Sequence, residues 1–259
     1  MMKEKYVFND LLTIMEKLRS DDGCPWDKEQ THDSLTKCLI EEAYETCDAI
    51  SEKSPEKMAE ELGDVLLQVV FHAQIGKEEK TFSMDDIIDG ICKKLVYRHP
   101  HIFGDKKFNS SDQVLESWEK LKIQEKGYSS EADSMNKIPK NFPALMRAYK
   151  VQQKAQRVGF DWPEISGAFN KIYEETQELK QAIDTNDSDM QKEEAGDLLF
   201  AVVNVCRFLD IDPEQCLNKS SDKFIKRFTY VENSCIDNGL DMKQMTIDEL
   251  DKYWDEAKK

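Results

Sequence analysis

The hydrophobic positions of this chain follow a helical period from end to end. Apolar residues recur three and four positions apart, which is the spacing of an amphipathic helix. No run of alternating or β-branched residues bounded by turns interrupts this pattern, so it calls for no strands. The predicted helices cover residues 8–19, 33–51, 55–79, 84–98, 112–126, 142–156, 164–184, 189–209, 213–237 and 247–257. The pattern predicts an all-α protein.

Several helix starts can be located from capping residues. Ser54 and Asp212 each stand directly before a proline, the usual order of an N-cap and the first helical position. Ser83 and Thr246 are each followed three residues later by an acid, which is the spacing of a capping box. By contrast, residues 128–141 are rich in Ser, Asp, Asn and Pro, and we predict a linker there.

Six acids in the first half of the chain recur 133 positions later in the same order. The first set is Glu41, Glu42, Glu45, Glu60, Glu61 and Asp64, and the second is Glu174, Glu175, Glu178, Glu193, Glu194 and Asp197. The residues Lys94, Arg98 and Trp118 recur in order as Lys223, Arg227 and Trp254. We therefore predict a duplicated helical domain, with an N-terminal copy over 1–127 and a C-terminal copy over 142–259.

The spacing of the acids predicts a metal site in each copy. Glu175 and Glu178 share one helix face, and Glu194 and Asp197 share a face of the next helix, which can return antiparallel through the turn sequence "DTNDSD". Four carboxylates so close together must protonate, splay into solvent or bind cations. Ligands that are all oxygen select Mg²⁺ or Mn²⁺. The predicted ligands are Glu175, Glu178, Glu194 and Asp197, with a second set at Glu42, Glu45, Glu61 and Asp64.

The acids have two other interpretations. A charged helix face is commonly just solvated, and with 52 acids among 259 residues a single Glu-x-x-Glu is uninformative. The repeat with identical spacing favours the metal site. A ferritin-like di-iron site requires Glu-x-x-His on two helices, and the one such pair, Glu29 and His32, falls in a predicted loop. A di-iron oxidase is therefore disfavoured.

Candidate phosphate ligands lie near the C-terminus. Lys223 and Arg227 are four apart on one helix face and suit phosphate oxygens, although such pairs are often only surface residues. Trp254 can stack on a base or simply pack in the core. The chain has neither a P-loop nor a GxGxxG sequence, which excludes a glycine-rich phosphate cradle.

Composition narrows the classes of partner. A net charge of −16 provides no basic field for nucleic acid, which is not expected as a partner. Seven cysteines without a CxxC motif indicate reduced thiols and a cytoplasmic location. The N-terminus lacks the apolar segment of a signal peptide, and the longest apolar stretch, "VLLQVVFHA", is too short to cross a bilayer. No membrane association is expected.

Several longer motifs carry a family resemblance. "CPWDKEQTHDSL", "EELGDVLLQVVFHA", "RHPHIFG", "NFPALMRAYKVQQKAQRVGFDW" and "EEAGDLLFAVVNVCR" together resemble the MazG nucleoside triphosphate pyrophosphohydrolases over residues 8–258. The resemblance implies two four-helix-bundle-like units, assembled as a homodimer. It also implies Mg²⁺-dependent hydrolysis of NTPs and dNTPs, ATP included, to the monophosphate and pyrophosphate.

The resemblance also assigns roles to residues of the C-terminal copy, which is the active one in studied members of the family. The implied metal ligands are the four acids named above, with Glu174 beside them as a candidate general base. The implied substrate contacts are Lys171, Glu174, Lys223, Arg227, Trp254 and Lys258. Position 171 corresponds to Cys38 in the first copy, which therefore has one phosphate ligand fewer, although its own acids are intact.

We expect broad tolerance of the base, because lysine and arginine contacts to phosphate would supply most of the affinity. The cellular role would be cleaning of the nucleotide pool or a stress response. Two alternatives remain open from the sequence. One is a helical scaffold that binds Mg²⁺ without turnover. The other is a narrower phosphohydrolase that acts on one damaged nucleotide or an alarmone.

Overall fold

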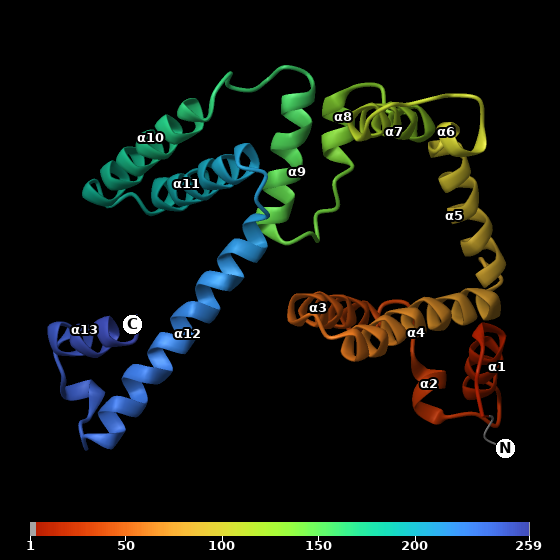
Figure 1. The fold of residues 1–259 in the computed structure, drawn as a ribbon, viewed down its shortest axis with the longest axis horizontal. Coiled ribbons are helices and arrows are strands. Elements are labelled where there is room, and N and C mark those ends of the chain that lie inside the picture. The colour runs from red at the N-terminus through yellow and green to blue at the C-terminus, as the bar shows by residue number, and fades with distance from the viewer. Residues whose placement is uncertain (1–3, 259) are drawn as a thin grey trace. The chain divides into compact units, whose positions relative to one another are not determined.

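All regular secondary structure in residues 4–258, the part described by this computed structural model, is helical (Figure 1). The elements are α1 (Phe8–Leu18), α2 (Pro25–Glu29), α3 (Thr36–Glu52), α4 (Pro55–Glu79), α5 (Met84–Arg98), α6 (Pro100–Phe103), α7 (Ser111–Lys126), α8 (Glu131–Asn136), α9 (Ala144–Arg157), α10 (Ile165–Asp184), α11 (Ser188–Phe208), α12 (Pro213–Asp237), the 3₁₀ turn η1 (Met242–Gln244) and α13 (Ile247–Glu256). The all-α prediction is confirmed. Every predicted helix is present: α4, α5 and α12 have the predicted ends, and the other ends lie within three residues of those predicted. The helices α2, α6 and α8 and the turn η1 were not predicted.

The predicted caps are present. The side chain of Ser54 accepts a hydrogen bond from the backbone N–H of Lys57, the third residue of α4, and Asp212 accepts one from Gln215, the third residue of α12. Ser83 and Thr246 each form a reciprocal capping box with the acid three residues later. These local hydrogen bonds satisfy backbone donors that the first turn of a helix leaves free, so they fix where each helix begins.

The chain separates into two compact units, one up to Lys122 and one from Ile123 onward. The stretch that we predicted as a linker, 128–141, contains helix α8, which packs on α9 within the second unit. Glu131 on α8 pairs with Lys154 on α9 at 3.3 Å. A short helix thus forms in part of a stretch whose composition indicated only a loop.

In the first unit α3 pairs with α4, and α1 and α5 pack on α4. The core lies around the second half of α4 and consists of Met15, Leu35, Val70, Phe71 and Ile75. A pair of imidazoles lies beside this core: the Nδ1 atoms of His32 and His72 are 2.7 Å apart, and their ring planes differ by 8°. This contact ties the segment before α3 to α4.

In the second unit α10 and α11 form a hairpin, and α9 packs against α11. Gln152 on α9 donates a hydrogen bond to the backbone carbonyl of Phe200 on α11 at 2.7 Å. Helix α12 begins against α9, leads away from the hairpin and contacts α13 near its other end (Figure 1). The α10–α11 hairpin and the α12–α13 pair are therefore packed as two separate helix pairs, which α9 connects.

Much apolar surface is uncovered. The accessible surface of the chain is 18939 Å². Two separate globular proteins, each of half this mass, would together expose roughly 14,000 Å². The uncovered side chains include Leu199 and Phe200 on α11 and Ile225 on α12. No helix among residues 4–258 is long and apolar enough to cross a membrane.

Candidate metal centre and substrate groups

The hairpin of α10 and α11 is built by its turn and by small residues. Asn186 takes the left-handed conformation (φ 55°), which asparagine tolerates better than most residues. Asp187 then caps α11 by accepting hydrogen bonds from the backbone N–H groups of Asp189 and Met190. Ala182 at the end of α10 is completely buried. The predicted turn in "DTNDSD" is therefore where the chain reverses.

This hairpin brings acids from both helices together. Glu174, Glu175 and Glu178 can offer oxygens within 4.8 Å of one another, and Glu175, Glu194 and Asp197 can do the same. Glu175 belongs to both groups and is only 3% exposed. The acids that we predicted as metal ligands in the second copy thus surround one buried carboxylate.

Lys171 is the cation of this cluster. Its Nζ lies 2.7 Å from Glu174 and also pairs with Glu175, one turn further along α10. These two hydrogen bonds raise the pKa of Lys171, and the hydrogen bond from Lys171 holds the pKa of Glu175 below its usual value. Glu175 is therefore ionised and available as a ligand.

The other acids of the cluster behave differently. The hydrogen bond with Glu175 raises the pKa of Glu178. Loss of solvation and the negative charge of Glu178 raise the pKa of Glu194. One lysine thus does not neutralise the cluster, and a further proton or cation stabilises it. A set of carboxylate oxygens at these separations fits a hard divalent ion such as Mg²⁺ or Mn²⁺.

The N-terminal copy forms the equivalent cluster between α3 and α4. Glu42, Glu45 and Glu61 can place oxygens within 4.8 Å of one another. Desolvation and the charge of Asp64 raise the pKa of Glu42, and desolvation and the charge of Glu45 raise that of Glu61. Because Cys38 stands where the second copy has Lys171, this cluster has no lysine at that position.

The predicted phosphate and base contacts other than Lys171 lie on α12, on α13 and just beyond the end of α13. The guanidinium carbon of Arg227 is 5.8 Å from the centroid of the Trp254 ring, and Lys223 is exposed one turn earlier on α12. Lys258 pairs with Asp255 at 2.7 Å. Among the residues described, Lys171 is the one predicted substrate cation that contacts the carboxylates.

A cavity between α12 and α13 was not predicted from the sequence. It measures 280 Å³ and is lined by Phe224, Phe228, Val231, Met242, Ile247, Leu250, Asp251 and Trp254. The Phe224 and Trp254 ring centroids are 5.1 Å apart. Phe224 and Phe228 are four residues apart, and Asp251 and Trp254 are three apart, so each pair shares one helix face. This spacing was the only sequence pattern that could have indicated the cavity.

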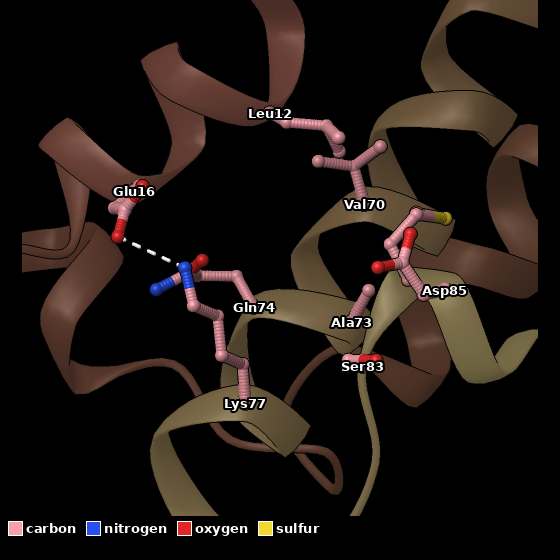
Figure 2. A pocket seen from close by; sticks show the side chains of 9 residues that line it. Leu12, Glu16, Val70, Ala73, Gln74, Lys77, Ser83 and Asp85 are labelled. Carbon is pink, nitrogen blue, oxygen red and sulfur yellow. Dashed lines mark hydrogen bonds and ion pairs between the residues drawn. The ribbon is translucent and has the colours of Figure 1, made fainter. Parts of the chain in front are cut away.

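A second cavity, of 200 Å³, lies in the first unit between α1, α4 and the start of α5. Figure 2 shows Leu12 and Val70 facing one another across it and the Glu16–Lys77 ion pair, at 2.9 Å, to one side. Its α4 residues belong to the second half of that helix, whereas Glu61 lies near the beginning. This cavity is therefore separate from the acids of the first copy.

Comparisons with known proteins agree with the duplication. The family model of the MazG nucleotide pyrophosphohydrolase domain matches residues 30–103 and again 166–231. A protein from Thermotoga maritima named nucleoside triphosphate pyrophosphohydrolase/pyrophosphatase MazG is 48% identical over 99% of this chain and 98% of its own length. A nucleoside triphosphate pyrophosphohydrolase from Escherichia coli K12 is 41% identical over 96% of both chains.

Among solved structures, a crystal structure of a mazG-related protein from Thermotoga maritima is 25% identical with a TM-score of 0.38, covering 44% of this chain and 97% of that one. The two matched segments contain both acid clusters, one in each hairpin. The domain match and the near full-length identity establish the relationship. The chain belongs to the MazG nucleotide pyrophosphohydrolase family, with the family domain present twice.

Proposed function

We propose that this protein hydrolyses nucleoside and deoxynucleoside triphosphates to the monophosphate and pyrophosphate. The observation that carries the proposal is the convergence of acids from α10 and α11 on the buried Glu175. The names of the relatives from Thermotoga maritima and Escherichia coli support the same reaction. We place the reaction in the C-terminal copy because Lys171 is present there.

The proposed ligands for Mg²⁺, which Mn²⁺ can replace, are Glu175, Glu178, Glu194 and Asp197. When bound, the ion supplies positive charge that neutralises the triphosphate and polarises the attacking water. The raised pKa values of Glu178 and Glu194 support this assignment, because they show that the cluster lacks positive charge. The equivalent acids of the first copy form a second candidate site.

The remaining groups bind substrate and move a proton. The oxygen of water adds to the α-phosphorus while the bond from that phosphorus to the α–β bridging oxygen breaks, so that pyrophosphate leaves. We assign Glu174 as the base that accepts the proton from water, because it is exposed beside the cluster. Lys171 and Lys258 would bind phosphate oxygens. Lys223 and Arg227 stabilise the charge of the leaving pyrophosphate.

We also propose that the protein acts as a homodimer. The uncovered apolar side chains of α11 and α12 support this, as does an accessible surface well above that of separate globular units. A second copy can also bring α12 and α13 against the α10–α11 hairpin, since α12 leads away from the hairpin within one chain. Light scattering coupled to gel filtration would give the mass: a monomer at micromolar concentration contradicts the proposal.

The proposed role is cytoplasmic cleaning of the nucleotide pool or a stress response, with all common bases accepted. The test is to incubate the protein with each of the eight common NTPs and dNTPs, with and without Mg²⁺, and to identify the products by anion exchange. We expect the monophosphate and pyrophosphate only when Mg²⁺ is present. Turnover of a single modified nucleotide would instead favour a narrow phosphohydrolase, and Mg²⁺ binding without any turnover would favour a scaffold.

A further inference from the structure

Lys171 places a positive charge of the protein itself in the carboxylate cluster of the second copy. Its Nζ lies 2.7 Å from Oε1 of Glu174 and also pairs with Oε1 of Glu175. Glu175 belongs to both groups of acids whose oxygens converge in this copy. The ammonium group therefore binds the same carboxylate that a divalent ion in either group would use.

Lys171 can leave this position, whereas the carboxylate is fixed. The side chain of Lys171 is 36% exposed, and that of Glu175 is 4% exposed. The two residues lie four apart on α10, so Lys171 turns toward solvent by rotation of its own long side chain. A partly exposed ion pair of this kind is held by a small net free energy. Lys171 is thus a displaceable counter-ion of Glu175.

A divalent ion and this ammonium group compete for the same oxygens. Two positive charges that share a carboxylate repel one another, and the repulsion is strongest where burial reduces screening. An ion that arrives alone must displace Lys171 into solvent, at the cost of its ion pairs. A triphosphate changes this balance, because its oxygens accept the displaced ammonium group. Binding of the ion to the second copy is therefore coupled to binding of phosphate.

The first copy has no such competitor. Cys38 stands where the second copy has Lys171, and a thiol carries no positive charge. The neighbouring Lys37 pairs with Glu41 at 3.2 Å, and Glu41 lies outside the group of converging acids. Among residues 4–258, no ion pair joins a lysine to the converging acids of this copy. A divalent ion can therefore bind there without displacing a lysine.

We propose that Lys171 occupies the cation position of the second copy until a nucleotide arrives, so that this copy takes up its divalent ion together with triphosphate, whereas the first copy binds the ion alone. This inference rests on the proposed function and adds an order of binding to it. Lys171 passes from Glu174 and Glu175 to a phosphate oxygen, and Glu174 is then free to accept the proton from water.

Binding of Mn²⁺ without nucleotide tests this order, with the free ion measured by its electron paramagnetic resonance signal at pH 8. Each copy is followed separately in the full chain, the second in a Glu42→Gln background and the first in a Glu175→Gln background. Lys171→Met should tighten Mn²⁺ binding to the second copy by about tenfold, the value of one hydrogen bond to a charged group. Cys38→Lys, which introduces the competitor, should weaken binding to the first copy by a similar factor.

Two control variants separate competition from a general effect of charge. Lys180→Met removes a lysine of the same helix that lies outside both ion pairs, and it should leave the affinity for Mn²⁺ unchanged. Lys171→Arg keeps the competing charge and should bind Mn²⁺ as weakly as the wild type. For the Mn²⁺ complex of non-hydrolysable α,β-imido ATP, measured by calorimetry, the sign reverses: Lys171→Met should bind it about tenfold more weakly than the wild type.

The opposite signs for the bare ion and for its nucleotide complex decide the outcome. Unchanged or weaker binding of bare Mn²⁺ in Lys171→Met would overturn the inference, because Lys171 would then support the metal ligands. A first copy that binds bare Mn²⁺ no better than the second, or a chain that binds none, would also overturn it. These measurements need no turnover, so a protein that hydrolyses no nucleotide would contradict the proposed function and still give a result for Lys171.

Discussion

The two hairpins share their acids but differ in how those acids are compensated. In α10–α11, Lys171 pairs with the buried Glu175 and lowers its pKa. In α3–α4, Cys38 stands in that place, and the pKa of Glu42 is raised by burial and by its acidic neighbours. Two copies of one motif can therefore share their carboxylates and still differ in the neighbouring cation, which determines which carboxylate is ionised.

The corresponding arginines, Arg98 and Arg227, also differ between the two copies, in how far each is exposed to solvent. Each lies over the tryptophan of its own copy, Arg98 over Trp118 and Arg227 over Trp254, but Arg98 is only 8% exposed whereas Arg227 is half-buried. A guanidinium already buried against a ring has little freedom to bind phosphate. Both comparisons support our proposal that substrate is hydrolysed in the second copy, and they are consistent with cation binding alone in the first.

The largest expected effect comes from removing the central carboxylate of one copy at a time. Glu175→Gln should lower kcat for ATP hydrolysis by about 10³-fold, because a preorganised charged group in the site is lost. Glu42→Gln, its counterpart in the first copy, should retain nearly full activity. Steady-state pyrophosphate release measures both. Equal losses in the two variants would show that both copies hydrolyse substrate.

Next in size is the effect of divalent ions on stability. An ion at 100 times its Kd adds about 2.7 kcal/mol to the free energy of unfolding. Thermal melting after EDTA treatment, repeated with added Mg²⁺, should show this gain. The gain should shrink in both Glu175→Gln and Glu42→Gln if each copy holds an ion. A Tm that Mg²⁺ does not change would contradict both metal sites.

Exchanging Lys171 and Cys38, the residues that differ between the two acid clusters, should have an intermediate effect on activity. Lys171→Cys removes the hydrogen bond that lowers the pKa of Glu175, so this carboxylate ionises only at higher pH. The acid limb of the pH–rate profile should shift to higher pH, and kcat/KM at neutral pH should fall about tenfold. The reciprocal Cys38→Lys variant should leave the profile unchanged. An unshifted acid limb in Lys171→Cys would exclude this role for the lysine.

The smallest effect concerns the histidine pair, which the second unit lacks. Burial and the neighbouring His32 lower the pKa of His72 from 6.5. The stability that neutral His72 contributes is therefore present above pH 6.5 and is lost as the pH falls below it. Urea denaturation at pH 7.5 and pH 5.5 should show this loss, and His72→Gln should reduce it. A variant with the same pH dependence as the wild type would contradict the assignment.

The sequence predicted the limits of the long helices and the hairpin turn well, because both depend on local interactions. Helix limits followed from caps such as Ser54 and Asp212, and the approach of the acids on α10 and α11 followed from spacing and a short turn. Two features could not be predicted in this way. The direction in which α12 leaves α9 depends on long-range packing, so the separation of Arg227 from the hairpin was not foreseen. Helices as short as α6 contain too few residues to reveal a period.

The short turns within the hairpins also bear on how a duplicated chain folds. Two similar hairpins in one polypeptide can mispair during folding. A first helix of one repeat can pack on the second helix of the other repeat, and the chain is then trapped in a misfolded state. Only Lys53 and Ser54 separate α3 from α4, and three residues separate α10 from α11. Contacts of such low sequence separation form early and at little entropic cost. We therefore expect each hairpin to close before the other repeat can compete, and lengthening either turn to promote mispaired, aggregating species.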